Sequence, residues 1–369
     1  MRAVRSVVLA GGGTGGHVYP LLAFAACLRR HDPDVRITCL GAPWGLENDL
    51  IPPAGYELRT VPAYQLPRSV NLDLVRTPLR MWRSTRAARS VLDEVKADVV
   101  VGFGGYVAVP AYLAAWRRRI PIVIHELNVP PGIANRMGMR FTRHVAAGFK
   151  HQPRQAPALR DAQVVGVPLR RAIATLDRSA RRAEARKRFE LDPDRPTLLV
   201  FGASQGARTL NVASAGAAAA LTDAGIQVLH LMGARNEPVE IPGGLAAPYR
   251  TLAYLEEMEL AYAAADLALC RSGAMTCAEL AAVGLPAVYV PYPHSNQEQS
   301  RNALPVVESG GGLLVDDSTL TAAWVEENVV PLLNDRARLD RMSSAAAEHG
   351  HRDGDEALRE FMVRAVAAQ

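Results

Sequence analysis

The side chains of this sequence that are best placed for chemistry follow a short apolar run that ends at Cys270. Ser272 and Gly273 supply the cap and the turn that open a helix predicted from about Ala274 to Val283. The first turn of a helix has free backbone N–H groups and the positive end of the helix dipole, which together suit a diphosphate. Glu279 lies further along this helix, where its carboxylate can accept hydrogen bonds from two neighbouring hydroxyls, as on a ribose.

A polar loop follows the next predicted strand, Ala287 to Val290. Its side chains are an imidazole and three amides, from His294, Asn296, Gln297 and Gln299. The helix start, the carboxylate and the loop together indicate half of a sugar-nucleotide site. A capped amphipathic helix followed by a solvated loop would show the same residues, so the pattern leaves that alternative open.

A second candidate site lies near the start of the chain. Glycines at 11, 13 and 16 follow a strand predicted over Val4 to Ala10, and they let the backbone approach a ligand closely. His17 lies where this loop becomes a helix, so it is either a reactive group or a helix residue with a structural hydrogen bond. The spacing also matches a dinucleotide-binding loop, which needs an acidic residue at the end of the second strand. That strand, Val35 to Leu40, ends in glycine and alanine, which argues against a dehydrogenase.

His125 and Glu126 follow a third predicted strand, Ile122 to Ile124. Glu126 is a candidate general base. The alternative is a buried His–Glu pair that holds the loop, and we favour this interpretation for His125.

These loops require a framework of parallel strands that end side by side. Strands and helices alternate through the first half of the chain, which predicts a doubly wound parallel sheet. The pattern of a strand followed by a glycine turn recurs at Leu198–Arg208, which aligns with Val7–His17 at a constant offset of 191 residues. We therefore predict an α/β protein of two Rossmann-like domains in tandem. The predicted boundaries are 1–168, 169–342 and a final helix over 343–369 that packs back on the first domain.

The composition and charge of the chain indicate which classes of binding partner to expect. The 369 residues are 49% hydrophobic and 21% charged, which is typical of globular proteins. The four cysteines form no CxxC pair and are interpreted as buried thiols. Residues 1–170 contain 23 basic and 11 acidic side chains, yet no nucleic-acid-binding motif accompanies them. An anionic membrane surface is the better candidate partner.

Two segments of the first half combine aromatic, apolar and basic residues. Leu66 to Arg89 places Leu72, Leu79 and Trp82 among arginines, and Trp116 precedes three more arginines. Such surfaces lie at the head-group boundary of anionic membranes, although a core-facing helix with a solvated basic face fits equally well.

The sequence offers little support for a metal site. Each of the three D-x-D pairs, at residues 32–34, 192–194 and 353–355, encloses proline or glycine, so turns explain them. We expect no metal and no cofactor.

The run RSGAMTCAEL, followed by GLP and HSNQEQSRNA, resembles the donor-site motif of one enzyme family. The loops GGTGGH and HELN, and the runs GVPLR and GASQGA, carry the resemblance along the whole chain. The family is the peptidoglycan N-acetylglucosaminyltransferases, which move GlcNAc from UDP-GlcNAc to lipid I and so form lipid II. The resemblance implies the B-type glycosyltransferase fold, with two Rossmann-like domains facing a cleft, and a metal-independent inverting hexosyltransferase.

The resemblance also implies site residues. His17 is the candidate base, with Glu126 as runner-up. The residues that the resemblance implies for UDP-GlcNAc binding are Thr14, Gly15, Gly16, Asn128, Arg170, Ser204, Leu255, Ala274, Met275, Thr276, Cys277, Ala278, Glu279 and Gln299. Ala203 stands where the family usually has glycine.

The implied acceptor is undecaprenyl-pyrophosphoryl-MurNAc-pentapeptide, attacked through its MurNAc C4 hydroxyl. Because that acceptor is anchored in the bilayer, we expect peripheral binding at the cytoplasmic face of the cell membrane. Other proteins of cell-wall synthesis or division are candidate partners. Two alternatives remain: a natural-product glycosyltransferase of the same fold, and a UDP-GlcNAc 2-epimerase.

Overall fold

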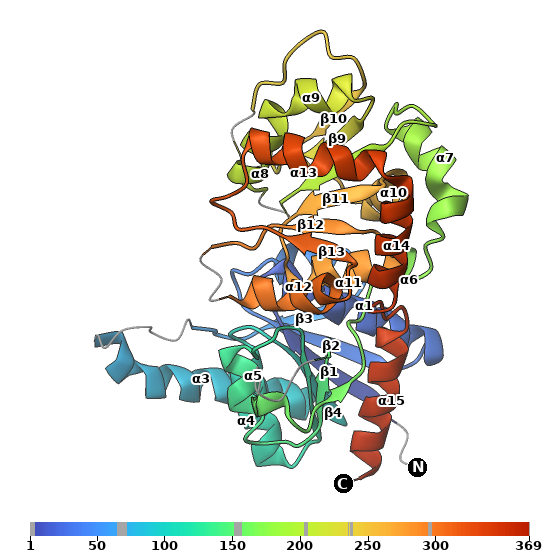
Figure 1. Ribbon diagram of the computed structural model, residues 1–369. Coiled ribbons are helices and arrows are strands. Elements are labelled where there is room, and N and C mark those ends of the chain that lie inside the picture. Colours follow the sequence, from blue (N-terminus) through green and yellow to red (C-terminus); the bar gives the residue numbers. More distant parts are fainter. Residues whose placement is uncertain are drawn as a thin grey trace. The chain divides into compact units, whose positions relative to one another are not determined.

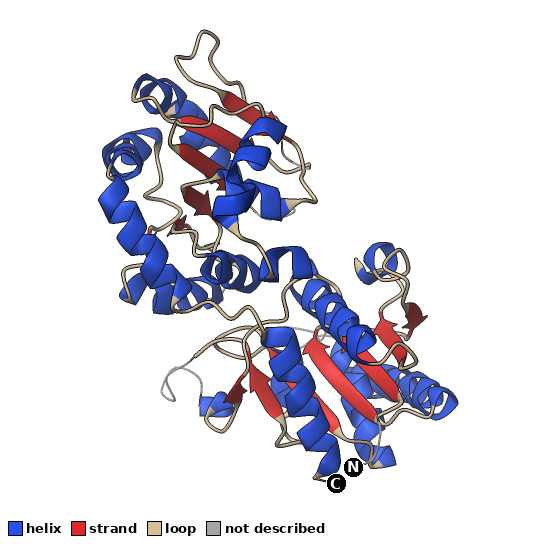
Figure 2. Ribbon diagram, turned by 90° about the vertical axis from the view of Figure 1, so that its right-hand side faces the viewer, coloured by secondary structure: helices blue, strands red, loops and turns tan. Residues whose placement is uncertain are grey.

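The computed structural model describes residues 4–64, 72–150, 157–202, 206–234, 236, 239–293 and 297–368. The chain divides into two compact units: unit 1 is Met1–Arg170 with Asp353–Gln369, and unit 2 is Arg171–Arg352. Each unit has a parallel sheet covered by helices (Figures 1 and 2), so the predicted fold class of two doubly wound sheets is confirmed. The units change two residues after the predicted boundary at 168, and again at 352 rather than at 342.

Unit 1 is built on a seven-stranded sheet. Its strands are β1 (Ser6–Gly11), β2 (Arg36–Gly41), β3 (Glu57–Thr60), β4 (Val99–Gly104), β5 (Ile122–Glu126), β6 (Val145–Ala147) and β7 (Gln163–Val164). Its α-helices are α1 (Gly15–His31), α2 (Glu47–Leu50), α3 (Leu72–Val95), α4 (Ala108–Arg118), α5 (Ile133–Gly138) and α15 (Gly354–Ala367). The strand order is β3-β2-β1-β4-β5-β6-β7, so the direction of winding reverses between β1 and β4.

Both faces of this sheet are buried, which explains the continuous apolar runs of its strands. Val7 and Leu9 of β1 pack in one core with residues of α1 and α15. Val8 and Ala10 point to the opposite face and pack with residues of α3 and α4. The alternation along β1 thus anchors two layers of helices.

The last helix, α15, belongs to unit 1 through a firm contact with α1. Arg30 donates a 2.6 Å hydrogen bond to Asp355, and Leu358 and Met362 enter the core beside α1. A Cβ atom on Gly354 would lie 2.6 Å from the carbonyl oxygen of Val167, so the chain passes closely there.

Unit 2 repeats the plan with six strands. Its strands are β8 (Thr197–Phe201), β9 (Gln227–Leu231), β10 (Tyr249–Leu252), β11 (Leu267–Cys270), β12 (Ala287–Tyr289) and β13 (Gly312–Leu314). Its helices are α6 (Arg171–Ala174), α7 (Arg178–Arg188), α8 (Arg208–Gly216), α9 (Ala218–Asp223), α10 (Met258–Ala264), α11 (Ala274–Val283), α12 (Glu298–Glu308), α13 (Ala322–Asn334) and α14 (Arg336–Ala347). The order β10-β9-β8-β11-β12-β13 places the reversal between β8 and β11.

In open parallel sheets, ligands bind beyond the carboxyl ends of the strands, at the point where the strand order reverses. In unit 1 this point lies at the loops after β1 and β4. In unit 2 it lies at the loops after β8 and β11. The sequence motifs GGTGGH, GASQGA and RSGAMTCAEL follow β1, β8 and β11 respectively.

Candidate active site

The glycine loop between β1 and α1 lies at the reversal point of unit 1 and touches the loop after β4. A Cβ atom on Gly105 would lie 2.4 Å from the carbonyl oxygen of Gly12, so the two backbones meet with no room for side chains. Gly13 has a φ of +86°, which L side chains rarely adopt. Thr14 and Gly16 are exposed, which leaves this stretch accessible to a ligand.

His17 is partly buried at the start of α1, with its ring held by its own loop. Its Nδ1 atom lies 3.2 Å from the carbonyl oxygen of Gly12 and 3.2 Å from Oγ1 of Thr14. Because a carbonyl oxygen can only accept, the bond to Gly12 places the proton on Nδ1 and leaves Nε2 as the basic nitrogen. Burial lowers the pKa of His17, while the Gly12 hydrogen bond and the nearby Glu47 carboxylate oppose that shift.

Glu47, the first residue of α2, belongs to this site although sequence reasoning did not identify it. Its carboxylate is buried and accepts hydrogen bonds from the N–H groups of Gly13, at 2.8 Å, and Ala42, at 2.7 Å. The available signal was an acidic residue that closely follows two glycines after the second strand, six residues past Gly41 and two past Gly45.

Glu126 ends β5 and organises the loop that follows. One carboxylate oxygen accepts from the Asn128 N–H at 2.8 Å, and the other accepts from the Gly132 N–H and the Asn135 amide, each at 3.0 Å. With 3% of its surface exposed, this carboxylate is occupied by the loop. Its geometry is that of a loop anchor, and Asn128 is left partly exposed beside it.

His125 is wholly buried, and its Nε2 lies 2.9 Å from the carbonyl oxygen of Gly166. Burial lowers its pKa to about 4, so the ring is neutral near pH 7. This is the structural interpretation favoured from the sequence.

Arg170 is the last residue of the first segment of unit 1, and its side chain lies beside α1. Its guanidinium carbon is 5.4 Å from the centre of the Tyr19 ring, in the first turns of α1. A planar cation is thus close to the start of a helix, a combination that suits an anion.

In unit 2, α11 begins directly beyond β11. Gly273 is the N-cap residue and no side chain caps the helix, while the hydroxyl of Ser272 is buried and has no hydrogen-bond partner among the described residues. The cap predicted from Ser272 is therefore absent. The backbone N–H groups of the first turn, including Ala274 and Met275, are left without a side-chain acceptor from the cap.

The rest of α11 is buried on all sides, and its buried residues include Thr276, Cys277, Ala278 and Glu279. Glu279 is 8% exposed, and the hydroxyl of Tyr262 donates a 2.7 Å hydrogen bond to its carboxylate. The carboxylate therefore has a structural partner in α10 in addition to any ligand.

Arg271 joins the loops around this helix start. Its guanidinium donates to the carbonyl oxygens of Val290 and Pro291, each at 3.2 Å, and pairs with Asp317 at 2.5 Å. Gln299 lies in the first turn of α12 rather than in the predicted polar loop, and its side chain accepts a 2.9 Å hydrogen bond from the Tyr292 N–H.

Two further positions complete the predicted donor-site set. Leu255 is half-buried and follows β10 at the same edge of the sheet. Ser204, with Ala203, lies outside the described residues, as do His294 and Asn296.

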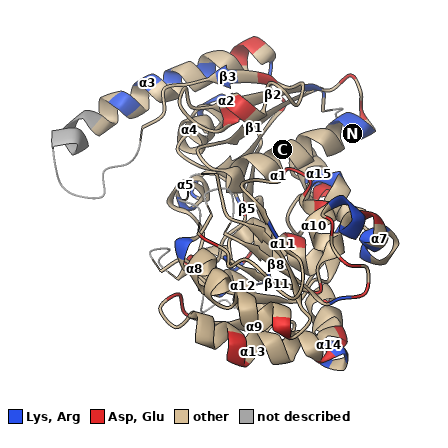
Figure 3. Ribbon diagram, turned by 90° about the horizontal axis from the view of Figure 1, so that it is seen from above, with Lys and Arg blue, Asp and Glu red and all other residues tan. Residues whose placement is uncertain are grey.

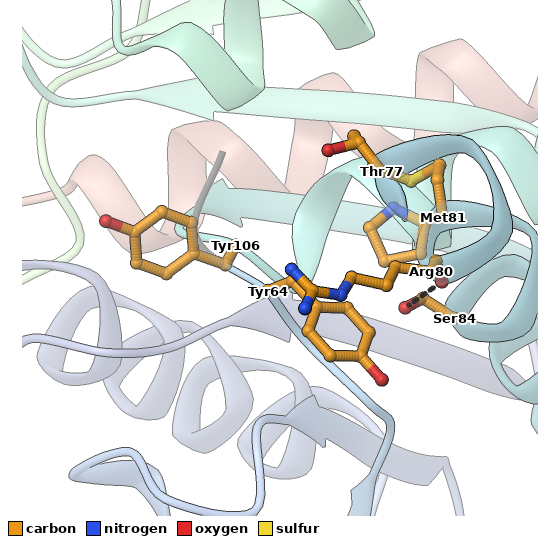
Figure 4. Close-up of a pocket in the computed structure, with 7 residues that line it drawn as sticks. Tyr64, Thr77, Arg80, Met81, Ser84 and Tyr106 are labelled. Carbon is orange, nitrogen blue, oxygen red and sulfur yellow. Dashed lines mark hydrogen bonds between the residues drawn. The ribbon is translucent and has the colours of Figure 1, made fainter. Parts of the chain in front are cut away.

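Aromatic side chains also lie at the carboxyl ends of the unit 1 strands, the edge that carries the glycine loop. Trp44, Tyr64 and Tyr106 are exposed and follow β2, β3 and β4 respectively. The rings of Trp44 and Tyr106 lie 6.1 Å apart, and the guanidinium of Arg80 lies 5.2 Å from the Tyr64 ring centre. Figure 4 shows the small pocket beside them, lined by Tyr64, Thr77, Arg80, Met81, Ser84, Tyr106 and Pro110.

The basic and apolar surface predicted from the sequence lies on α3 and α4, which pack against each other. Basic residues, blue in Figure 3, recur along α3. Leu79, Trp82 and Arg83 on α3 and Trp116 on α4 are exposed, and we refer to these four residues together as the α3–α4 patch, without implying that they touch one another. Within the described ranges, no helix combines the length and apolar character needed to cross a bilayer.

Among the described residues, one group of three could hold a metal ion: Cys27, His31 and Glu356. It lies at the carboxyl end of α1, away from the strand ends that carry the motifs. Burial raises the pKa of the Cys27 thiol to about 12, and Arg30 donates to Glu356 at 3.0 Å. A protonated thiol and a neighbouring cation favour a structural contact between α1 and α15.

Comparison with known proteins gives a consistent assignment. Residues 7–147 match the glycosyltransferase family 28 N-terminal domain, and residues 197–358 match the glycosyltransferase family 28 C-terminal domain. The UDP-N-acetylglucosamine–N-acetylmuramyl-(pentapeptide) pyrophosphoryl-undecaprenol N-acetylglucosamine transferase of Streptomyces coelicolor is 53% identical, covering 98% of this chain and 99% of its own. The same enzyme of Frankia casuarinae is 55% identical, covering 99% and 96%.

Solved structures agree with the fold. MurG of Acinetobacter baumannii superposes with a TM-score of 0.77 at 27% identity, over 98% of this chain and 99% of its own. The calicheamicin glycosyltransferase CalG4 (TM-score 0.67, 20% identity, 98% and 99% covered) shares the fold alone. The same holds for the UDP-GlcNAc 2-epimerase of Neisseria meningitidis, with a TM-score of 0.68 at 12% identity, over 97% and 100%.

The chain therefore belongs to glycosyltransferase family 28, among the UDP-N-acetylglucosamine–N-acetylmuramyl-(pentapeptide) pyrophosphoryl-undecaprenol N-acetylglucosamine transferases.

Proposed function

We propose that this chain transfers GlcNAc from UDP-GlcNAc to the MurNAc C4 hydroxyl of lipid I, forming lipid II with inversion at the anomeric carbon. The observation that carries the proposal is identity of 53–55% with transferases of that name, over nearly the whole length of both chains. The structural neighbours cited for the natural-product and epimerase alternatives are distant, at 20% and 12% identity.

Unit 2 is proposed to bind the donor. The free N–H groups at the start of α11 would receive the diphosphate, and Glu279 would accept hydrogen bonds from the ribose hydroxyls. Leu255 lies in the loop after β10 and Gln299 in the first turn of α12, both at the same edge of the sheet, as uracil and sugar contacts would require. Ser204 is proposed as a further donor contact from the loop after β8.

Unit 1 is proposed to supply the base and to bind the acceptor. Nε2 of His17 carries the basic lone pair and would take the proton of the C4 hydroxyl as that oxygen attacks the anomeric carbon. His17 is preferred to Glu126 because the Glu126 carboxylate already accepts three hydrogen bonds from its own loop. Asn128 and the exposed Thr14–Gly16 backbone would contact the sugar being transferred.

Charge on the leaving UDP needs stabilisation, and the chain has groups for that task. Arg170, beside Tyr19 of α1, carries a full positive charge. The N-terminus of α11 carries a partial positive charge, and either group could stabilise an anion. We therefore propose a mechanism without a metal ion. The aspartates at 32 and 192 accept hydrogen bonds from the N–H groups of Asp34 and Asp194 in their own turns, which agrees with a structural role.

The acceptor's lipid places the reaction at a membrane. We propose that the α3–α4 patch docks on the anionic cytoplasmic surface, with Trp82 and Leu79 inserting shallowly and Arg83 near the head groups. The exposed rings of Trp44 and Tyr106 offer faces for the acceptor's sugar.

The deciding experiment is incubation of the pure protein with UDP-GlcNAc and lipid I, followed by mass analysis of the lipid fraction. The proposal predicts a lipid product heavier by one N-acetylhexosamine residue, and UDP in equal amount. Conversion of UDP-GlcNAc without acceptor would support the epimerase alternative. Transfer to a different lipid or peptide, with lipid I unused, would support a natural-product glycosyltransferase.

A further inference from the structure

Glu47 is a buried carboxylate beside the proposed base, and nothing in the proposed reaction yet uses it. We propose that Glu47 is a positioning residue for the transfer, holding the glycine loop and orienting His17 through the peptide group between Gly12 and Gly13. This inference rests on the proposed function, because it assigns to His17 the role of base.

The first argument is the place of the carboxylate in the fold. Glu47 has no exposed surface, and its two oxygens accept hydrogen bonds from loops that follow different strands. Oε2 accepts from Gly13 after β1 at 2.8 Å, and Oε1 accepts from Ala42 after β2 at 2.7 Å. A buried carboxylate that joins two strand-end loops limits the movement of both.

The second argument is the space reserved for this side chain. A Cβ atom on Gly12, Gly41 or Gly45 would lie 2.3, 2.5 or 2.1 Å from an atom of the Glu47 side chain. None of these three glycines has a positive φ, so the space for Glu47, rather than backbone freedom, explains the absence of side chains there. Three glycine positions at two strand ends therefore leave room for one carboxylate.

The third argument is the path from Glu47 to His17. The Gly13 N–H that donates to Glu47 and the Gly12 carbonyl that accepts from His17 Nδ1 belong to the same peptide group. In a trans peptide these two groups point in opposite directions, so the carboxylate and the imidazole lie on opposite sides of it. A carboxylate that accepts from the N–H polarises the group and makes the carbonyl oxygen a stronger acceptor.

This arrangement resembles a carboxylate–histidine pair with a peptide inserted between its members. During transfer, the proton of the acceptor hydroxyl moves to Nε2, and His17 becomes an imidazolium. The negative charge of Glu47 stabilises that cation, and the relay through Gly12 keeps the ring in the tautomer with Nε2 unprotonated. Of the other groups against the ring, Gly12, Thr14 and Gly104 are neutral, and among the described residues Glu47 is a charged group that acts on His17.

The test is Glu47→Gln, with Asp49→Asn as the matched control, since Asp49 is an exposed carboxylate of the same helix. We expect Glu47→Gln to lower kcat about 10- to 100-fold, less than the roughly 10²–10⁴-fold loss of a whole base, with KM for UDP-GlcNAc unchanged. Removing the anion lowers the pKa of His17, so the acidic limb of the pH–kcat profile moves to lower pH while the plateau falls. Asp49→Asn should match the wild type.

A merely structural role would reduce the active fraction and leave the acidic limb in place. An unmoved limb, or a Glu47→Gln enzyme as active as Asp49→Asn, would overturn the proposal. Should Glu47→Gln fail to fold, Glu47→Asp keeps the charge but shortens the side chain. It should keep the wild-type limb with reduced kcat, and wild-type kcat in this variant would refute the positional role.

A readout independent of turnover separates this inference from the proposed function. NMR titration of the His17 ring, assigned with His17→Ala, should give a lower pKa in Glu47→Gln than in the wild type. If wild-type protein makes no lipid II, the proposed function fails, while the titration still tests the link between Glu47 and His17. Equal His17 titration in both proteins would remove that link.

Discussion

Glu279 offers a quantitative test of the donor site, because the structure gives its carboxylate a partner of its own. The Tyr262 hydroxyl donates to it at 2.7 Å, and Tyr262 is 1% exposed. Glu279→Ala would therefore remove the proposed ribose contacts and also leave a buried hydroxyl without its acceptor. Tyr262→Phe removes that hydroxyl alone, since the phenylalanine ring keeps the packing against Phe201.

The expected magnitudes follow from the types of bond lost. Losing charge-assisted hydrogen bonds to the ribose should cost roughly 1.5–3 kcal/mol of UDP binding, which raises Kd about 10- to 150-fold. Loss of the hydrogen bond from Tyr262 to Glu279 should cost about 1–3 kcal/mol of folding free energy in Glu279→Ala. Tyr262→Phe should lose about 1 kcal/mol of stability and keep its affinity for UDP.

Isothermal titration calorimetry with UDP gives the Kd of each variant, and thermal unfolding gives its stability. The reasoning predicts that affinity and stability separate: Glu279→Ala loses both, and Tyr262→Phe loses stability only. Wild-type affinity in folded Glu279→Ala would remove Glu279 from the site. An equal loss of affinity in Tyr262→Phe would show that Glu279 acts by packing α10 against α11.

Three further outcomes are expected. His17→Ala should keep UDP affinity and lower kcat roughly 10²–10⁴-fold. In the wild type, the rate should fall with acid only below the ordinary imidazole pKa of 6.5, because burial lowers the pKa of His17. If the acidic limb of the pH–rate profile survives in His17→Ala, the role of base passes to Glu126. EDTA should leave the rate of lipid II formation unaltered, whereas inhibition reversed by Mg²⁺ would contradict the metal-free mechanism. In co-sedimentation, the protein should bind anionic liposomes more than neutral ones, and salt should weaken that binding. The double variant Trp82→Ala/Arg83→Glu should bind anionic liposomes less than the wild type. Equal binding of the variant and the wild type would show that the α3–α4 patch is not the docking surface.

Much of this protein could be predicted from the sequence because the relevant patterns are local. Apolar runs that end in glycine loops or polar turns predicted the parallel strands and the positions of their strand-end loops. The repeated design at Val7 and Leu198 predicted two similar sheets, and both are present. The loop before His17 and the helix start at Ala274 were placed correctly, since the residues that form each of them are neighbours in the chain.

The tertiary structure decided which side chains meet. Glu47 reaches Gly13 across 34 residues, and Tyr262 reaches Glu279 across 17, and no local period encodes either contact. Glu126 resembled a free base in the sequence, and only the folded loop shows its three hydrogen-bond donors. The physical reason is that periodicity and turn chemistry act over a few residues, whereas the partners of a buried charge are set by the packing of strand ends that are distant in sequence.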